Sequence, residues 1–448
     1  MRQNSKLKVV IGLGKTGYSC VRHLVKHNNN IAVVDSRKQP PMLQQLRTSF
    51  SNVPVYVGNF AEDILARADE LIVSPGISIN EPSIAKQVKS GIPAIGDIEL
   101  FTRCIKAPVV AITGSNGKST VTTLVGEMAK CAGLNVLVGG NLGTPALDLL
   151  DEPNPDLYVL ELSSFQLETM YSLRAEVAVV LNISPDHMDR YKNIEEYTAA
   201  KMRIYNGCKV AVINRMERVC REQACLFPTN GLKYLFFGPD KPKQDEFGIL
   251  DSCLAYGSHK LLAVNELKIK GQHQAVNALA ALAIGTAVKL PMSTMLQVLQ
   301  EFKGLPHRCQ WVAEIEGVDW YDDSKGTNVG ATRAAIEGMG ASIDGKLILI
   351  AGGRGKGLDY SLLYAVVKKY VRSVILIGED APKLAAALNS VAKISNANSM
   401  QQAVELAMQQ ARKGDMVLLS PACASFDMFD NFEHRGEVFA NEVNKMRE

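Results

Sequence analysis

The sequence predicts an α/β protein built on parallel sheets. Short apolar runs rich in Val and Ile alternate with helical patterns through almost the whole chain, and Gly, Asp, Asn or Pro bounds each run. Unbroken apolar runs of this length are typical of strands that are buried on both faces. The polar, poorly periodic region from Cys220 to Leu262 breaks this pattern and is expected to be an irregular elaboration. The runs are Val9–Ile11, Ile31–Val34, Val109–Ile112, Leu157–Leu162, Val177–Ile183, Val210–Ile213, Leu347–Ala351, Val374–Ile377 and Met416–Leu419.

The length of the chain, 448 residues, predicts two to four domains. One boundary is expected near Gly96–Asp97, just before the helix-like stretch Ile98–Cys104. A second is expected near Gly304–Pro306, where the helical stretch Ser293–Phe302 meets a Gly and Pro break. The predicted domains are therefore 1–97, 98–304 and 305–448.

Composition and charge narrow the class of protein. With 49 basic and 46 acidic residues the net charge is only +3, which gives no reason to expect a nucleic-acid or anionic-membrane partner. Nine cysteines without a CxxC pair indicate a reduced protein with neither disulfides nor zinc. The longest apolar stretch, Ala278–Val288, is short of the roughly 20 residues that span a bilayer, and Met1–Lys8 shows no signal peptide. We expect a cytoplasmic monomer.

A phosphate-binding loop is predicted at the start of the middle domain. The segment Ala111–Thr120 follows a strand, precedes a helix and contains small residues that let backbone N–H groups close on a polyphosphate. Lys118 would reach the terminal phosphates, and the Ser119 hydroxyl would lie on Mg²⁺. Ile112 stands where the common GxxxxGK[ST] form has its first glycine, so Thr113–Gly114 supplies the turn. The pattern predicts a P-loop ATPase-type centre that binds ATP.

The N-terminal segment carries a second nucleotide signal. Strand Val9–Ile11 leads into the GxGxxG sequence Gly12–Gly17, and Asp35 ends the next strand 18 residues after Gly17. Alone, this motif predicts a Rossmann-like unit and favours an NAD-dependent dehydrogenase. The domain has only about 95 residues, roughly half of a full dinucleotide-binding fold, and the same loop binds any diphosphate at a helix N-terminus. A nucleotide-sensing module without turnover remains a third alternative.

Ordered motifs extend over essentially the whole chain, and together they resemble the Mur ligase family, which includes folylpolyglutamate synthase. The segments that carry the resemblance are Thr113–Thr120, Glu161–Leu167, Asn182–Asp189, Ala199–Lys201, Gly271–Asn277, Leu305–Arg308, Asp322–Asn328, Gly352–Lys356 and Ser420–Asp427. The Glu161 and Ser420 motifs are similar to the D-glutamate-adding branch, and the Asp-Asn-Pro-Arg signature of the diaminopimelate-adding branch is absent. A folylpolyglutamate-synthase-like ligase is the alternative within the family.

The resemblance implies an ATP-dependent ligase of peptidoglycan precursor synthesis. Such an enzyme adds D-glutamate to UDP-N-acetylmuramoyl-L-alanine through an acyl phosphate, because a carboxylate is a poor electrophile until it is phosphorylated. The resemblance also implies a UDP-binding first domain, an ATP-binding second domain and a Rossmann-like third domain that completes the amino-acid site. Two Mg²⁺ sites are implied, with Mn²⁺ as an expected substitute.

The same resemblance assigns roles to individual residues. Implied catalytic residues are Lys118, Glu161, His187 and Lys201, and implied metal-binding residues are Ser119, Glu161, His187 and Lys201, with Lys201 carbamylated. The implied ATP-binding residues are Gly114, Ser115, Asn116, Gly117, Lys118, Ser119, Thr120, Asn277, Arg308, Asp323 and Lys325. The implied UDP-substrate residues are Lys15, Thr16, Asp35, Ser36, Arg37, Ser74, Asn141 and Ser163, and the implied D-glutamate residues are Thr327, Lys356, Ser425 and Phe432. Gln274, where the family usually has Asn, and Gly355, where relatives are often acidic, depart from the pattern.

Overall fold

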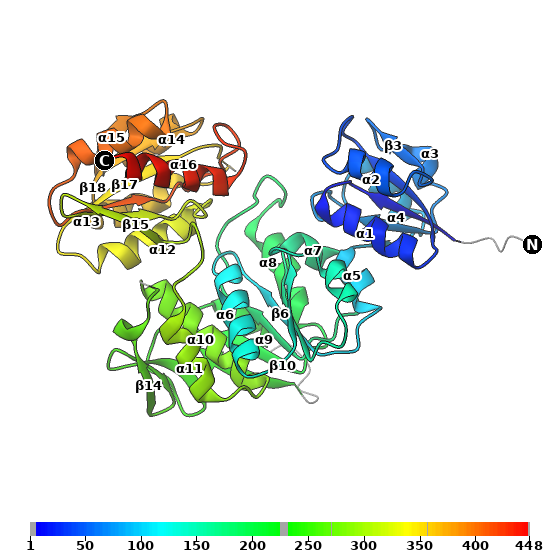
Figure 1. Cartoon of the computed structure of the whole chain (residues 1–448), viewed down its shortest axis with the longest axis horizontal. Helices are drawn as coiled ribbons and strands as arrows, with labels where there is room; N and C mark the ends of the chain where they lie inside the picture. The colour runs from blue at the N-terminus through cyan, green and yellow to red at the C-terminus, as the bar shows by residue number, and fades with distance from the viewer. Residues whose placement is uncertain (1–5, 225–231, 270, 356, 447–448) are drawn as a thin grey trace, which may run out of the picture.

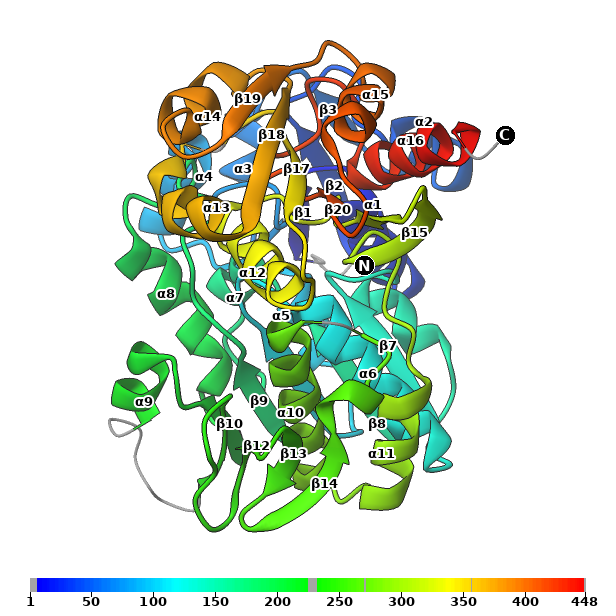
Figure 2. The same cartoon turned by 90° about the vertical axis from the view of Figure 1, so that its left-hand side faces the viewer.

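Three sheets follow one another along the chain in the computed structural model, which describes residues 6–224, 232–269, 271–355 and 357–446. Figure 1 shows the N-terminal segment in blue and the C-terminal segment in yellow to red on opposite sides, both above a central segment in cyan to green. Figure 2 shows the helices that cover both faces of the C-terminal sheet. The predicted three-domain α/β architecture is confirmed. No helix in these ranges combines the length and the apolar character needed to cross a membrane.

The N-terminal sheet is parallel and has the strand order β3-β2-β1-β4-β5. Its central strand β1 ends at the glycine loop, where the chain order reverses between β1 and β4. Ligands of open α/β sheets bind at such a switch point. The elements are β1 (Leu7–Ile11), α1 (Lys15–Lys26), β2 (Asn30–Asp35), α2 (Leu43–Ser49), β3 (Val55–Val57), α3 (Glu62–Leu65), β4 (Glu70–Val73), α4 (Pro82–Lys89) and β5 (Ala94–Ile95).

The central sheet has nine strands in the order β14-β13-β12-β11-β10-β9-β6-β8-β7. Strand β6 lies between β8 and β9, is buried along its whole length and leads into the phosphate loop. The elements up to β10 are α5 (Asp97–Thr102), β6 (Val109–Thr113), α6 (Lys118–Cys131), β7 (Val136–Gly140), β8 (Leu157–Glu161), α7 (Ser164–Glu168), β9 (Val177–Val180), α8 (Ile194–Met202) and β10 (Val210–Asn214). Two long helices, α10 (Gln272–Ala287) and α11 (Met292–Glu301), pack beside α6.

The expectation of an irregular region from Cys220 to Leu262 is wrong. After α9 (Arg218–Ala224), the described part of this region forms four strands that extend the central sheet. Residues of these strands join the core around α10, and Tyr234 and Phe236 of β11 also pack against the other core of the central sheet. These strands form because the first of them pairs with the open edge of β10. That edge belongs to another segment, so the sequence of this region alone does not reveal it. The strands are β11 (Lys233–Phe237), β12 (Glu246–Leu250), β13 (Cys253–Tyr256) and β14 (His259–Ala263).

The C-terminal sheet has the order β15-β16-β20-β17-β18-β19, and it is parallel except for the β15–β16 hairpin. Separate apolar cores cover its two faces. Its elements are β15 (Gln310–Ile315), β16 (Val318–Asp322), α12 (Val329–Gly340), β17 (Leu347–Gly352), α13 (Tyr364–Tyr370), β18 (Val371–Ile377), α14 (Ala381–Leu388), β19 (Lys393–Asn396), α15 (Met400–Gln410), β20 (Met416–Leu419) and α16 (Phe432–Lys445). Short 3₁₀ turns occupy Ala146–Asp151, Arg203–Tyr205, Val264–Glu266 and Tyr360–Leu363.

Candidate active site

A cavity of about 700 Å³ lies between the central and C-terminal segments, at the carboxyl ends of their strands. This edge of a parallel sheet is where ligands gather in open α/β folds. Most residues predicted for ATP, metal and D-glutamate meet here although they are far apart in sequence. Those that line the cavity are Ser115, Asn116, Gly117, Lys118, Ser119, Asn141, Glu161, Ser163, His187, Lys201, Arg308, Lys325, Thr327, Ser425 and Phe432.

The phosphate loop has the geometry that its glycines require. Gly114 and Gly117 have φ angles of +153° and +81°, and a Cβ on Gly117 would lie 2.5 Å from Oδ1 of Asn277. The Lys118 ammonium folds back and donates to the carbonyls of Gly114 and Ser115 at 2.8 and 3.0 Å. The loop therefore carries its own cation at the N-terminus of α6, where phosphate binding is favoured.

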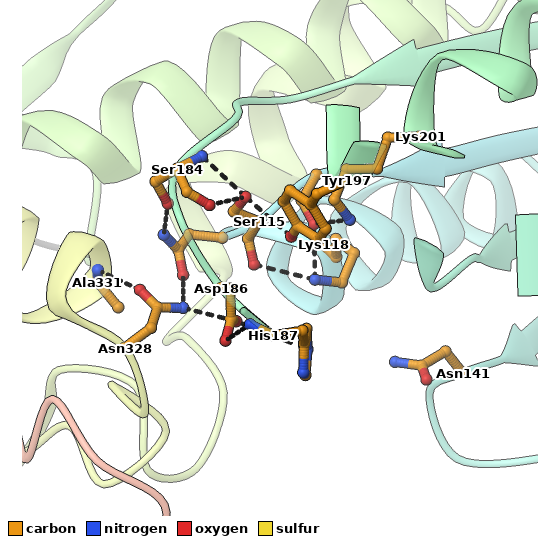
Figure 3. A network of polar contacts seen from close by, with 12 residues as sticks. Ser115, Lys118, Asn141, Ser184, Asp186, His187, Tyr197, Lys201, Asn328 and Ala331 are labelled. Carbon is orange, nitrogen blue, oxygen red and sulfur yellow. Dashed lines mark hydrogen bonds and ion pairs between the residues drawn. The ribbon is translucent and has the colours of Figure 1, made fainter. Parts of the chain in front are cut away.

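Polar contacts from the segment after β9 hold the loop in place (Figure 3). Oγ of Ser115 donates to the Ser184 carbonyl and accepts from the Ser184 N–H, both at 2.9 Å. The Tyr197 hydroxyl lies 3.0 Å from the same Oγ. The Ser115 side chain therefore fixes the phosphate loop against Ser184 and Tyr197.

Lys201 reaches the loop from α8 and is only 2% exposed. Its Nζ donates to the Gly114 carbonyl at 2.9 Å and to Oγ1 of Thr113 at 3.4 Å, and it lies 4.7 Å from the centre of the Tyr197 ring. Burial, followed by repulsion from Lys118, holds the pKa of Lys201 well below its ordinary value. This amine is therefore deprotonated at lower pH than a surface lysine.

Glu161 ends β8 and faces the phosphate loop. Its Oε1 accepts from Nδ2 of Asn141 at 2.6 Å, and its Oε2 is buried without a hydrogen-bond partner among the described residues. Burial alone would raise the pKa of Glu161, but the Lys118 charge and the contacts with Ser119 and Asn141 hold it below its ordinary value. The side chain is thus an anion with one oxygen available to a cation.

His187 adopts a left-handed backbone conformation with φ of +58°, and its N–H donates to Oδ1 of Asp186 at 2.9 Å. Asp186 also accepts from Nδ2 of Asn328 at 3.0 Å, which joins the central and C-terminal segments (Figure 3). Asp186 lies in the motif around His187, and Asn328 lies in the motif around Asp323. Neither Asp186 nor Asn328 was given a role from the sequence. In the described ranges no three His, Cys, Asp or Glu side chains are grouped as metal ligands.

Arg308 connects the two segments at the phosphate loop. Its Nη2 donates to Oγ of Ser119 at 2.6 Å, so a C-terminal cation lies where the sequence places a metal-binding hydroxyl. Ser163 is the N-cap of α7 and exchanges hydrogen bonds with Gln166 in a capping box. Its hydroxyl therefore stabilises a helix end at the cavity wall.

A neighbouring cavity of about 320 Å³ is lined by three further predicted ATP residues, Thr120, Asn277 and Asp323. Oε1 of Gln274 accepts from Nδ2 of Asn277 at 3.1 Å, so the longer amide at position 274 supports Asn277. Oδ2 of Asp323 accepts from the Ser420 hydroxyl at 2.7 Å, and burial raises the pKa of Asp323 to about 7.

Lys356 and Phe432 are predicted D-glutamate residues, and Gly355 is the position where relatives are often acidic. Lys356 lies outside the described residues. A Cβ at Gly355 would collide with the Asp380 carboxylate and the Tyr360 hydroxyl, so any side chain at this position requires these groups to move. Phe432, the first residue of α16, packs under Lys325, whose Nζ lies 3.7 Å from the ring centre.

The lowered pKa of Lys325 sets an expected upper pH limit on ATP binding. Burial, followed by repulsion from Arg308, lowers the pKa of Lys325 to about 8. The ammonium is therefore complete well below pH 8 and is lost as the pH rises through this value. We expect kcat/KM for ATP to fall above pH 8. In Lys325→Arg the fall should move to higher pH, because a guanidinium stays protonated. Identical profiles for both proteins would contradict this origin.

The N-terminal glycine loop lies apart from this cavity. Asp35 accepts from the Leu13 N–H and from Nη2 of Arg37, both at 2.7 Å, which lowers its pKa against the raising effect of burial. The Ser74 hydroxyl donates to the Gly12 carbonyl at 2.8 Å. Asp35 and Ser74 thus fix the loop, while the half-exposed Arg37 faces solvent. The predicted UDP residues outside the cavity are Lys15, Thr16, Asp35, Ser36, Arg37 and Ser74.

Arg37→Ala should weaken UDP binding about 10-fold or more, since a charge-assisted hydrogen bond is worth about 1.5–3 kcal/mol. ATP affinity should change less than about twofold, because the ATP residues lie on another sheet. Calorimetric titration with each nucleotide measures both effects, with the exposed neighbour Lys38→Ala as control. Equal losses for both nucleotides would contradict separate sites. Asp35→Asn should also weaken UDP binding, by loosening Arg37.

The chain belongs to the Mur ligase family. Residues 6–96 match the MurD-like N-terminal domain, residues 112–285 the Mur ligase middle domain, and residues 307–423 the Mur ligase glutamate ligase domain. The chain is 51% identical over 444 residues to the UDP-N-acetylmuramoylalanine--D-glutamate ligase of Coxiella burnetii (strain CbuK_Q154), covering 98% of this chain and 99% of the relative. It is 52% identical to the enzyme of that name from Pseudomonas savastanoi pv. phaseolicola, covering 98% of both.

Solved structures of the family share the fold at low sequence identity. A MurF ligase from Thermotoga maritima, in complex with ADP, superposes with a TM-score of 0.62 at 18% identity, covering 99% of this chain and 96% of that one. A pseudomurein peptide ligase type C from Methanothermus fervidus gives 0.62 at 20% identity, covering 98% and 100%. The family match over residues 6–96 assigns the GxGxxG loop to a Mur ligase domain instead of a dehydrogenase.

Proposed function

We propose that this chain is an ATP-dependent ligase that joins D-glutamate to UDP-N-acetylmuramoyl-L-alanine in peptidoglycan precursor synthesis. The observation that carries the proposal is the 700 Å³ cavity, where the phosphate loop, Glu161, His187 and Lys201 face Lys325, Ser425 and Phe432 across a segment boundary. The full-length similarity to ligases of that name supports the choice of substrates.

Each segment has a proposed ligand, with boundaries at 97 and 304. Residues 1–97 hold the UDP group on the glycine loop, and Asn141 and Ser163 approach the muramoyl-alanine end. Residues 98–304 hold the ATP phosphates. Residues 305–448 hold D-glutamate through Thr327, Lys356, Ser425 and Phe432. The eight cysteines in the described ranges are free thiols, which supports the proposed cytoplasmic location.

The proposed reaction begins with transfer of the γ-phosphoryl group to the alanine carboxylate. The carboxylate oxygen attacks phosphorus and ADP leaves. The D-glutamate amine then attacks the carbonyl carbon of the acyl phosphate, the C–N bond forms as the amine loses a proton, and the C–O bond breaks to release inorganic phosphate. Lys118, Arg308 and Lys325 surround the place where negative charge builds up, and positioning can supply about 7–11 kcal/mol of barrier reduction. Closure of the two segments over the substrates would keep water from the acyl phosphate.

Mg²⁺ is the proposed metal, with Mn²⁺ as a substitute. Oε2 of Glu161 is a buried carboxylate oxygen without a hydrogen-bond partner among the described residues, and hard cations prefer such oxygens. Ser119, Glu161, His187 and modified Lys201 would hold two ions. When bound, they would neutralise the phosphate oxygens.

Lys201 is proposed to be carbamylated. Its neutral amine would attack the carbon of CO₂ and lose a proton, which leaves an anionic carbamate. The low pKa of Lys201 supports this step because only the unprotonated amine reacts. Lys118, whose charge acts on Lys201, would stabilise the new negative charge.

The proposed function is tested by phosphate release with ATP, UDP-N-acetylmuramoyl-L-alanine and D-glutamate, leaving out each in turn. Turnover should require all three. Robust turnover with folate and L-glutamate would move the chain to the folylpolyglutamate branch. NAD reduction with a hydroxy acid would favour a dehydrogenase, and tight nucleotide binding without turnover would favour a sensor.

A further inference from the structure

Arg190 bridges the central segment and the N-terminal segment. Its Nη1 donates to the Pro75 carbonyl at 3.3 Å, and its Nη2 donates to the Ile77 carbonyl at 3.1 Å. The loop that carries these carbonyls follows β4 and begins at Ser74, whose hydroxyl donates to the Gly12 carbonyl of the glycine loop. Arg190 thus bonds to the loop that begins at Ser74, and this loop in turn bonds to the glycine loop. The proposed function gives the glycine loop to the UDP group.

The same guanidinium also contacts the wall of the cavity. Its Cζ lies 4.4 Å from the centre of the Phe165 ring, and Nη2 lies 3.4 Å from Oε2 of Glu168. Phe165 in turn meets the His187 imidazole edge-on, with ring centres 4.9 Å apart, and both rings line the cavity. The backbone adds a second link, because the Arg190 N–H donates to the His187 carbonyl at 2.9 Å.

We propose that Arg190 is a positioning residue that sets the His187 loop against the glycine-loop side of the N-terminal segment. It transmits the position of a ligand held on the glycine loop to the imidazole in the cavity. The identity of that ligand as a uridine diphosphate rests on the proposed function. The physical basis is that one mostly buried cation satisfies two carbonyls of one segment while stacking on an aromatic ring of the other.

Arg203 provides a matched control within the central segment. It donates from Nε to the Leu167 carbonyl at 2.8 Å and from Nη2 to the Met170 carbonyl at 2.9 Å, and its Cζ lies 5.3 Å from the Tyr171 ring centre. Arg190 and Arg203 therefore make the same kinds of contact, but only Arg190 makes them across segments. Loss of two carbonyl bonds and a ring contact is common to both Gln variants.

The first test follows the His187 imidazole by NMR in protein labelled with ¹³C-histidine. The chain has seven histidines, and the signal that disappears in His187→Gln identifies this one. Without ligand, Arg190→Gln should shift the His187 signal, because the edge-on Phe165 ring moves, whereas Arg203→Gln should leave it unchanged. Added UDP should shift the signal in the unsubstituted protein and in Arg203→Gln, and the response should be lost in Arg190→Gln.

The second test is kinetic. With all three substrates, Arg190→Gln should lower kcat about 10- to 100-fold, the scale expected for a misplacement of about 1 Å. Its Kd for UDP should stay within about twofold, because Arg190 does not face the glycine loop directly. Arg190→Lys retains the charge but reaches one carbonyl, so its kcat should be intermediate. Arg203→Gln should retain kcat and lose only thermal stability.

An unchanged His187 signal in ligand-free Arg190→Gln, or equal losses of kcat in Arg190→Gln and Arg203→Gln, would overturn the proposal. Failure of the unsubstituted protein to turn over the three substrates would instead overturn the proposed function. The ligand-free NMR comparison decides the role of Arg190 in either case.

Discussion

Lys118→Ala is expected to lower kcat by about 10²–10³-fold, the scale seen when one preorganised donor to a developing anion is removed. The Lys118 ammonium donates to the Gly114 and Ser115 carbonyls of its own loop, which holds it at the N-terminus of α6. A polyphosphate on the loop would exchange these neutral acceptors for anionic ones, which form stronger bonds. Steady-state phosphate release measures the loss.

Lys130→Ala on the last turn of the same helix is the control, because Lys130 is exposed and lies away from the cavity. Both variants should keep the circular dichroism spectrum and a cooperative thermal transition. Lys118→Arg should recover little activity, since a fork-shaped guanidinium does not fit the space of a point charge. Retention of most activity in Lys118→Ala would show that the loop has only a structural role.

Lys201→Ala is expected to lose activity by about 100-fold or more, and acetate should restore part of it. The expectation rests on the carbamate proposed for Lys201, whose anionic oxygens acetate would replace in the space left by the side chain. The buried amine with its depressed pKa is suited to react with CO₂. In protein freed of CO₂, added bicarbonate should therefore raise the activity. This rise should be slower at lower pH, because a smaller fraction of the Lys201 amine is neutral there.

A ¹³C carbamate signal should appear in the unsubstituted protein supplied with labelled bicarbonate and be absent from Lys201→Ala. Lys192→Ala, an exposed lysine just before α8, should retain both activity and signal and be indifferent to acetate. An unmodified Lys201 amine in the active, metal-bound enzyme would refute the carbamate. Stable protein without acetate rescue would leave Lys201 as a structural donor to the Gly114 and Thr113 oxygens.

Local signals were sufficient to predict much of the fold. The β6 strand, the phosphate loop and the start of α6 follow from a continuous apolar run, small flexible residues and a Lys-Ser-Thr helix start, all within a dozen residues. The N-terminal glycine loop is equally local: a Cβ at Gly17 would collide with the Gly12 carbonyl, so the motif alone implies a tight turn. Both signals describe backbone geometry that neighbouring residues impose.

Only the tertiary structure decided which side chains meet. The strands β11 to β14 escaped prediction because their pairing depends on the open edge at β10 and on burial against α10, neither of which lies in their own sequence. The bond between Asp186 and Asn328 spans 142 residues, and the bond between Ser119 and Arg308 spans 189. The sequence shows which chemical groups the chain contains. The distances between these groups, their burial and their pKa values depend on how the three sheets pack together. For the same reason, the link from Pro75 through Arg190 and Phe165 to His187 exists only in the folded chain.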